Sequence, residues 1–291
     1  MSLGPGVRGF SVVPWVGLAW VAGVLGAGAQ AQVLRAASAA TEASAQAAAS
    51  ARIEAARAAL SQAFEQTWLE PAPADGAGFQ ALMSPFETLR TAGAASASDW
   101  SLAAHLALRH WRFDQLAAWQ QSPVGRQHVG DIPLPRAVRP LPAGQAPGWW
   151  AWQADEQALV ETAAQARAPT ELWVVFHPQC GPCRRMQAAV RASAPLQALM
   201  DRCGRWVAQM DARFNPREFT QWAQQAGQAP VQFRRAWADT GVPAPRATPV
   251  MLLMREGRHV QTVTGWPREG REAELMAAVR AADAEGRCVP R

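Results

Sequence analysis

The stretch from Glu171 to Met186 constrains the fold of this chain more than any other. It begins with an apolar run, Leu172–Phe176, that is typical of a buried β-strand. A sharp turn follows, and the sequence Cys-Gly-Pro-Cys at 180–183 then begins a helix. Two thiols at this spacing can close a small disulfide ring, and the positive end of the helix stabilises a thiolate at the first of them. We therefore expect Cys180 and Cys183 to form a dithiol suited to thiol–disulfide exchange.

A second segment, far downstream, supports the same expectation. Residues 247–254 (Ala-Thr-Pro-Val-Met-Leu-Leu-Met) predict a strand, and residues 255–265 predict a turn and a returning strand. Together with the dithiol motif, this segment resembles thioredoxin, whose active site has the same Gly-Pro pair between its cysteines. The resemblance covers roughly the C-terminal half of the chain. It implies an α/β, thioredoxin-like fold in which helices flank a central mixed sheet.

The resemblance also assigns roles to individual residues. In thioredoxins a cis-proline lies against the dithiol, and the backbone before it pairs with the substrate like an added strand. These roles fall on Pro249 and Thr248. Gly181 and Pro182, between the cysteines, complete the expected substrate-binding set. The implied activity is that of a thiol:disulfide oxidoreductase, which needs no cofactor because the exchange uses only cysteine sulfur.

Several positions depart from the thioredoxin pattern. Gln179 replaces the tryptophan before the first cysteine, and Val174 replaces a buried acidic residue. Gln209 stands where the partner lysine of that acid is expected. Because the acid–lysine pair assists proton removal from the second cysteine, His177 becomes a candidate for proton transfer here. An insertion at about 212–246 separates the central strand from the proline segment and exceeds usual loop lengths.

The two remaining cysteines, Cys203 and Cys288, follow the expected dithiol helix and the expected last helix. In a thioredoxin fold these two helices cover the same face of the sheet, so their ends could meet. An even, leftover pair in an exported protein suggests a structural disulfide. The alternative is two free thiols too far apart to be bridged.

The N-terminal segment 1–31 has the pattern of an export signal. Phe10–Ala29 is apolar, Arg8 precedes it, and Ala29-Gln30-Ala31 offers a small-x-small cleavage site. An uncleaved anchor is the alternative. Export implies an oxidising compartment, which is the periplasm if the source is a Gram-negative bacterium.

The rest of the chain divides by composition. Residues 32–128 predict an α-helical region, rich in alanine at its start. The proline-rich segment 129–148 predicts an extended linker. The thioredoxin-like domain is expected at 149–291, with a first strand at 149–152 followed by a helix over 154–167, so that it begins as a β-α-β series.

Charge and composition limit the classes of partner. The chain has a net charge of +5 that rests on arginine alone, and no basic run alternates with aromatic residues, so nucleic-acid binding is not expected. A metal carrier using Cys180, Cys183 and a histidine is a weak alternative, because no further ligand is well placed. We expect no metal site.

Two functions remain. The first is an exported oxidoreductase that acts on protein thiols and disulfides and exchanges electrons with a membrane partner; the direction of electron flow stays open. The second is an assembly or binding module of an envelope machine, such as a conjugation or secretion apparatus. An apolar stripe at Leu60, Phe64 and Trp68 packs within the chain or, as the other possibility, forms a homodimer through the N-terminal helices.

Overall fold

The computed structural model divides the chain into two units, Met1–Arg52 and Ile53–Arg291. Helix α1 (Ala27–Leu69) contributes to both. Its part in the first unit is almost wholly exposed, including the apolar side chains of Val33 and Leu34. The structure describes residues 27–69, 76–142, 148–163, 166, 168–211, 213–227, 231–234, 237, 241–242 and 247–289.

Most of the predicted export signal lies outside the described residues. The predicted cleavage site, 29–31, falls in the first turns of α1. Across the described part of the chain, none of the helices combines the length and the apolar character that a membrane span requires.

The second unit begins with a helical region. An apolar face of α1, including Leu60, packs there with aromatic residues of the following helices, among them Phe79, Phe86, Trp100 and Trp119. Ser96 and Asp99 form a capping box that fixes the start of α3. The helices after α1 are α2 (Gly76–Thr91), α3 (Ala97–Arg109), α4 (Phe113–Gln121) and α5 (Pro123–Val129).

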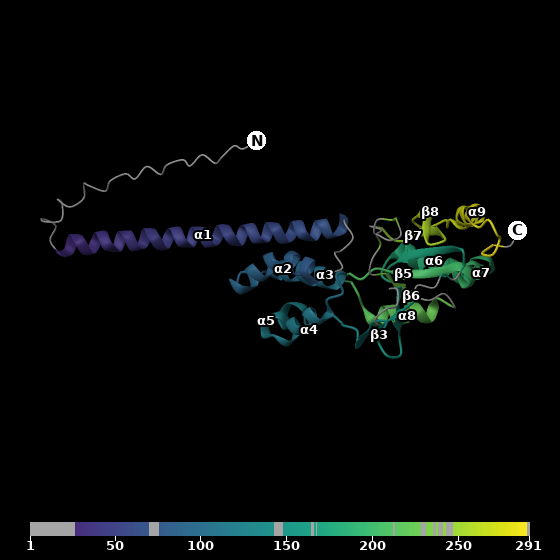
Figure 1. Ribbon diagram of the computed structural model, residues 1–291, viewed down its shortest axis with the longest axis horizontal. Helices are drawn as coiled ribbons and strands as arrows, with labels where there is room; N and C mark the ends of the chain where they lie inside the picture. The colour runs from purple at the N-terminus through teal and green to yellow at the C-terminus, as the bar shows by residue number, and fades with distance from the viewer. Residues whose placement is uncertain are drawn as a thin grey trace, which may run out of the picture. The chain divides into compact units, whose positions relative to one another are not determined.

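A mixed sheet and the helices that cover it form the rest of the second unit (Figure 1). Among the described residues it has eight strands in the order β1-β3-β2-β6-β5-β4-β7-β8. The central strands β4, β5 and β6 run parallel, and β7, β8 and the β2–β3 hairpin add antiparallel pairs. The strands are β1 (Ala137–Arg139), β2 (Trp149–Gln153), β3 (Ala158–Thr162), β4 (Thr170–Phe176), β5 (Gly204–Ala208), β6 (Val231–Phe233), β7 (Val250–Arg255) and β8 (Arg258–Thr264).

The β-α-β start expected for the domain is wrong. The helix expected over 154–167 is not formed, because Ala158–Thr162 is strand β3, which pairs antiparallel with β2. Ala158 and Leu159 are fully buried there, so packing outweighs the helical preference of the alanines nearby. One of the two neighbours of β5 is also unexpected: on the side away from β4 it is β6, which comes from the predicted insertion 212–246.

The proline-rich segment 129–148 is not only a linker. Its residues Ala137–Arg139 form β1, which pairs parallel with β3 at the edge of the sheet. Pro135 and Pro140 flank this short strand, which agrees with the confinement of proline to strand ends and edges.

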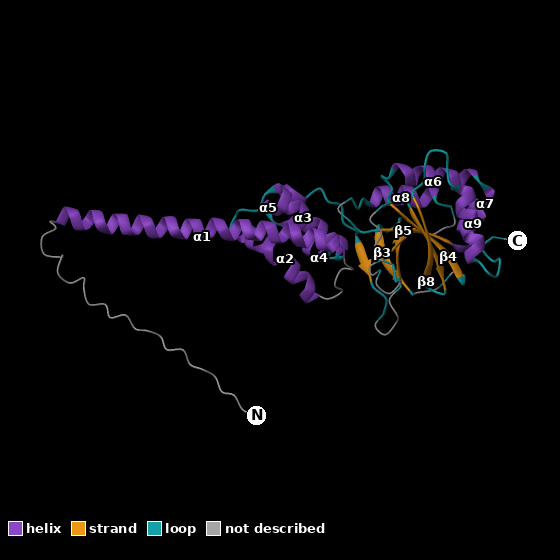
Figure 2. Ribbon diagram, turned by 90° about the horizontal axis from the view of Figure 1, so that it is seen from above, coloured by secondary structure: helices purple, strands orange, loops and turns teal. Residues whose placement is uncertain are grey.

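The helices of this part pack on one face of the sheet. Side chains of Leu172, Val174 and Phe176 face a core shared with α6, α7, α8 and α9, whereas Trp173 and Val175 belong to a second cluster on the opposite face. Figure 2 shows α6, α7 and α8 together on one side of the strands. These helices are α6 (Gly181–Ala192), α7 (Ala194–Cys203), α8 (Pro216–Gln225) and α9 (Glu272–Ala282).

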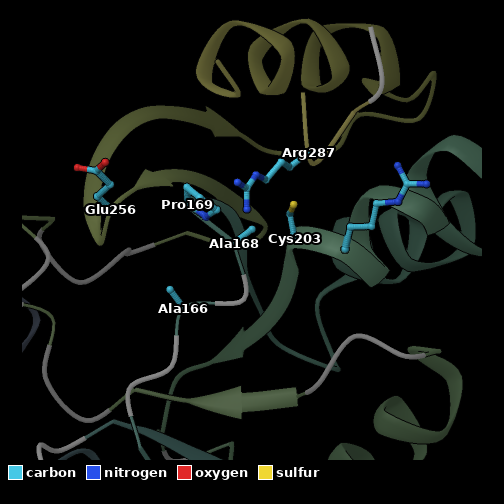
Figure 3. A pocket seen from close by; sticks show the side chains of 7 residues that line it. Ala166, Ala168, Pro169, Cys203, Glu256 and Arg287 are labelled. Atoms are coloured by element: carbon cyan, nitrogen blue, oxygen red, sulfur yellow. The ribbon is translucent and has the colours of Figure 1, made fainter. Parts of the chain in front are cut away.

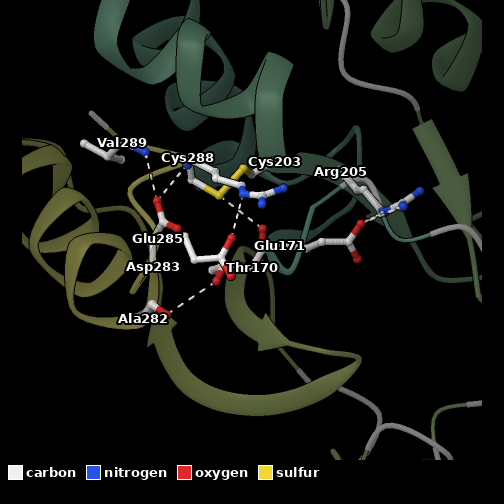
Figure 4. The surroundings of a disulfide bond; sticks show 10 residues. Thr170, Glu171, Cys203, Arg205, Ala282, Asp283, Glu285, Cys288 and Val289 are labelled. Carbon is white, nitrogen blue, oxygen red and sulfur yellow. Dashed lines mark hydrogen bonds and ion pairs between the residues drawn. A yellow bond between two sulfur atoms is a disulfide. The ribbon is translucent and has the colours of Figure 1, made fainter. Parts of the chain in front are cut away.

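Cys203 and Cys288 are joined in a disulfide, with their Cα atoms 5.6 Å apart (Figure 4). Cys203 ends α7, and Cys288 lies beyond α9, in the position that the sequence suggested. The Asp283 carboxylate holds the end of the chain, because it accepts hydrogen bonds from the backbone N–H groups of Cys288 and Val289.

Candidate functional site

The end of β4 positions the dithiol. All seven residues of this strand are buried, and the chain turns directly after Phe176. Cys180 is the N-cap residue of α6, and its N–H group donates to the carbonyl oxygen of His177 at 3.0 Å. Pro182 lies in the first helical turn, where its missing N–H costs no helical hydrogen bond. The strand, turn and helix therefore follow the sequence prediction for 171–186.

The two thiols differ in exposure. Cys180 is partly exposed, whereas Cys183 is fully buried. The backbone N–H group of Cys183 donates to the Cys180 sulfur at 3.3 Å, so the start of the helix stabilises negative charge on the outer sulfur. Burial, followed by the hydrogen bond with Cys180, raises the pKa of the Cys183 thiol to about 12. The outer cysteine is thus accessible to a substrate, and the inner one keeps its proton at neutral pH.

The predicted proline segment lies against this dithiol. The peptide bond between Thr248 and Pro249 is cis. The Cys180 thiol donates to the Thr248 carbonyl oxygen at 3.2 Å, and the Thr248 side chain interacts with the Cys183 thiol. Gly181 and Pro182 are half-buried beside them. The structure therefore brings together residues that lie far apart in the sequence.

His177 is buried and turned toward other partners. Its Nδ1 atom accepts a hydrogen bond from the Gln179 N–H group at 3.2 Å, and its Nε2 atom lies 3.9 Å from Oδ1 of Asp211. Burial lowers the pKa of His177, so the ring is neutral at neutral pH. The His177 backbone, not the ring, is what interacts with the Cys183 thiol among the described contacts.

The sequence analysis gave no role to Asp211 and Arg213. Asp211 follows β5, whose carboxyl end lies beside that of β4 because the two strands are parallel neighbours. Its carboxylate is buried and pairs with the Arg213 guanidinium at 2.7 Å. Burial would raise the pKa of Asp211, but hydrogen bonds and charge from Arg213 lower it below its ordinary value. An acidic residue shortly after a buried parallel strand was the available signal.

The inserted helix α8 borders the dithiol turn. The Gln179 side-chain amide donates to Oε1 of Glu218 at 3.0 Å, so the position that departs from the thioredoxin tryptophan is tied to the insertion. A cleft of about 290 Å³ opens between α6 and α8 beside this contact. It is lined by Pro178, Gln179, Arg184, Gln187, Glu218, Gln221, Trp222 and Gln225.

A second, larger hollow of about 640 Å³ lies away from the dithiol (Figure 3). Its walls include Ala168 and Pro169, which precede β4, whereas Cys180 follows the other end of that strand. Figure 3 shows Arg287 and Cys203 at the same hollow. The described residues contain no group of three or more histidine, cysteine or acidic side chains that could hold a metal ion.

Comparisons with known proteins find structural similarity over about half of the chain. No family model matches it, and no curated protein matches it. A solution structure of an uncharacterized thioredoxin-like protein from Porphyromonas gingivalis is 23% identical, with a TM-score of 0.34, and the match covers 50% of this chain and 93% of that one. A candidate thioredoxin from Neisseria meningitidis is 16% identical, with a TM-score of 0.33 and a coverage of 49% and 93%. A conserved protein of unknown function from Bacteroides fragilis is 16% identical, with a TM-score of 0.31 and a coverage of 47% and 98%. Two of these three structures are thus described as thioredoxin-like or as a candidate thioredoxin, and the third has no assigned function.

Proposed function

We propose that this protein is an exported thiol:disulfide oxidoreductase that acts on protein disulfides through Cys180 and Cys183. One observation carries the proposal. A partly exposed cysteine at a helix N-terminus lies beside a buried partner, and the carbonyl of Thr248 is in contact with the outer sulfur. This arrangement gives one thiol that can be attacked or can attack, and a second that is protected until the first has reacted.

In the reducing direction, the Cys180 thiolate attacks one sulfur of a substrate disulfide. A bond forms between Cys180 and that sulfur, and the other substrate sulfur leaves as a thiolate that takes up a proton. Cys183 then attacks Cys180, which closes the Cys180–Cys183 disulfide and releases the second substrate thiol. The proton that Cys183 loses is taken up by this second leaving thiolate. The substrate gains two electrons, and the enzyme loses two.

The proposal extends to location and electron supply. Export to the periplasm rests on the signal pattern in 1–31, and the two leftover cysteines, joined in a disulfide, agree with an oxidising compartment. A reductase in that compartment needs a membrane partner that returns two electrons to the Cys180–Cys183 pair after each turnover. Substrates reach Cys180 from the side of Thr248, Pro249, Gly181 and Pro182.

The test is the reduction potential of the Cys180–Cys183 pair, measured in glutathione buffers. Peptide mapping after differential alkylation separates this pair from Cys203–Cys288. A value near −270 mV, about that of thioredoxin, would indicate a reductase, and a value near −120 mV would indicate an oxidant. We expect Cys180→Ser to abolish exchange with a protein disulfide. If the wild-type pair does not exchange at all, the proposed enzyme function is wrong.

A second candidate, an assembly or binding module, is favoured by α1. Its residues up to Arg52 form a long exposed helix with two exposed apolar side chains, Val33 and Leu34. We also propose, separately, that two copies of the chain associate through the N-terminal helices. Removal of residues 27–52 would then lower the molar mass measured by light scattering from that of a dimer to that of a monomer, whereas a protein without such an association would stay monomeric and keep its exchange rate.

A further inference from the structure

The cleft between α6 and α8 adjoins the dithiol turn. Its walls include Pro178 and Gln179, which directly precede Cys180, and Arg184, which directly follows Cys183. Consecutive Cα atoms lie about 3.8 Å apart across a trans peptide bond, so one edge of the cleft is a single residue from the outer cysteine. With a volume of about 290 Å³, it lies near the lower end of the sizes typical of small-ligand sites. The cleft is therefore large enough for a short piece of a chain whose cysteine reacts at Cys180.

The walls of this cleft are polar but carry no net charge. The single carboxylate and the single guanidinium cancel, and neither takes part in an ion pair among the described residues. A charged ligand would therefore gain little here, whereas an uncharged ligand with donors and acceptors would find partners for both. The polar side chains are Glu218, Arg184 and the four amides Gln179, Gln187, Gln221 and Gln225, beside Pro178 and Trp222.

The hydrogen bonds among the wall residues all involve amide groups. The Gln179 side-chain amide donates to Oε1 of Glu218 at 3.0 Å, and the Gln179 carbonyl accepts from the Arg184 guanidinium at 3.3 Å. The buried Gln187 amide donates to the Trp222 carbonyl at 3.3 Å. These are the donors and acceptors that a peptide chain or an amide side chain presents, so the same groups suit an incoming amide.

Glu218 has an acceptor to spare. Its Oε1 atom holds the Gln179 amide, whereas its Oε2 atom is buried and accepts no hydrogen bond from the described residues. A buried oxygen without a donor is destabilising, so this atom favours a further N–H group. The contact at Oε1 shows that the carboxylate accepts an uncharged amide N–H.

We infer that the cleft between α6 and α8 is a substrate subsite that binds uncharged amide groups next to the reactive cysteine of a protein substrate. The inference rests on the proposed function and names a substrate feature for it. Peptide groups and the side chains of asparagine and glutamine share this chemistry. Glu218 accepts their N–H groups, and the amide side chains of the cleft bind their carbonyl oxygens.

The test uses the reduced full-length protein and short peptides whose single cysteine is activated by thionitrobenzoate. The Cys180 thiolate attacks the peptide sulfur, a disulfide forms between them, and thionitrobenzoate leaves as a coloured thiolate. The cysteine is flanked on both sides by glutamine, leucine or lysine. A thionitrobenzoate disulfide of methanethiol, which has no amide group, is the reference. The ratio of the initial peptide and reference rates divides out the intrinsic reactivity of Cys180, and Cys180→Ser should abolish the fast release.

We expect Glu218→Ala to lower this ratio about three- to tenfold for the glutamine-flanked peptide, which is the effect of roughly one hydrogen bond. Gln225→Ala should lower it in the same direction. Gln224→Ala is the matched control and should change nothing, because its side chain is equally exposed on α8 but does not line the cleft. A loss shared by the leucine-flanked peptide assigns the contact to the peptide main chain, and a loss confined to the glutamine-flanked peptide assigns it to amide side chains.

Three results would overturn the inference: Glu218→Ala leaves the ratios of the glutamine- and leucine-flanked peptides unchanged, the loss is confined to the lysine-flanked peptide, or Gln224→Ala has the effect of Gln225→Ala. Near-ultraviolet circular dichroism verifies folding, and if Glu218→Ala is unfolded, the comparison of Gln225→Ala with Gln224→Ala decides.

The outcome is separate from that of the proposed function, because an activated peptide needs only the Cys180 thiol. A protein that shows the peptide preference but exchanges with no protein disulfide would refute the enzyme and leave the subsite standing. One that exchanges without this preference would refute the subsite alone.

Discussion

Cys183 shows how position alone separates the chemistry of two identical side chains. It lies three residues after Cys180 in the first turn of the same helix, but Cys183 is fully buried while Cys180 is partly exposed. Burial disfavours the charged thiolate and raises the pKa of Cys183 to about 12. In the proposed mechanism, the inner thiol would become a nucleophile only once Cys180 is part of a mixed disulfide.

This difference predicts stepwise labelling of the reduced protein. At about pH 7, iodoacetamide should modify Cys180 and leave Cys183 intact, because the raised pKa of Cys183 keeps it protonated at every pH well below 12. Labelling of Cys183 should rise only as the pH approaches that value. Mass spectrometry of the peptide that contains both residues measures the two rates. Equal labelling of both cysteines at neutral pH would contradict the burial argument.

At the residue scale, the sequence predicted what depends on local spacing. The 171–186 stretch and Thr248–Pro249 could be found because each motif is contiguous. The Asp211–Arg213 ion pair could not be placed beside the end of β4, since its position depends on the pairing of β4 with β5. His177 stays a candidate for proton transfer; its Nδ1 atom accepts the Gln179 N–H, and its Nε2 atom lies 3.9 Å from Oδ1 of Asp211, which no spacing rule reveals.

At the scale of elements, α3 links the helical region to the site. Trp111, just after α3, packs against Trp150 of β2 and Phe233 of β6, with ring centroids 5.1 and 6.3 Å apart. Burial lowers the pKa values of His105 and Arg109, on α3 itself, and the charge of Asp211 partly offsets this effect. The helical region therefore supports the sheet beside the dithiol and is not an independent extension.

The buried His105 makes the free energy of unfolding depend on pH. Burial lowers its pKa from 6.5 to about 4, so the unfolded chain binds a proton more readily than the folded protein between these values. The stabilisation is complete above pH 6.5 and is lost as the pH falls toward 4, by roughly 3 kcal/mol. Urea unfolding at several pH values measures this slope.

The matched variant is His105→Leu, which does not titrate. Whatever its free energy of unfolding at neutral pH, that value should fall less than the wild-type value between about pH 7 and about pH 4. An unchanged slope would mean that other groups cause the acid sensitivity, and His177 would be the next to replace, because burial lowers its pKa too.

The helix predicted over 154–167 is replaced by strand β3 because of packing between elements. Residues 154–167 are rich in alanine and glutamine and favour a helix locally, yet Ala158–Thr162 pairs with two strands, β1 and β2. Local preference amounts to less than about 1 kcal/mol per residue, so the burial of Leu159 and a complete set of strand partners outweigh it. The order of strands in the sheet is likewise not readable from the chain, since β6 enters from an insertion.

At the scale of the whole molecule, the Cys203–Cys288 disulfide closes a loop of 85 residues. We expect the double variant Cys203→Ser/Cys288→Ser to lower the free energy of unfolding by about 2–5 kcal/mol, because the unfolded chain gains freedom. Guanidinium titration of the oxidised proteins measures the loss. The rate of alkylation of Cys180 should stay the same, since the two pairs lie at opposite ends of β4; a large change in that rate would show that the pairs are coupled.

The position of β6 has a consequence for the order in which the fold is completed. The N-terminus of the chain emerges first, whether the chain leaves a ribosome or a translocation channel. The β2–β3 hairpin is therefore present before Val231–Phe233, the strand that joins it to β5. At about 5–20 residues per second, synthesis of the segment from Thr162 to Val231 takes on the order of several seconds. During that interval the edge of β2 and its tryptophans have no sheet to pair with, so chaperones that bind exposed apolar strands would meet this protein at Trp149–Gln153.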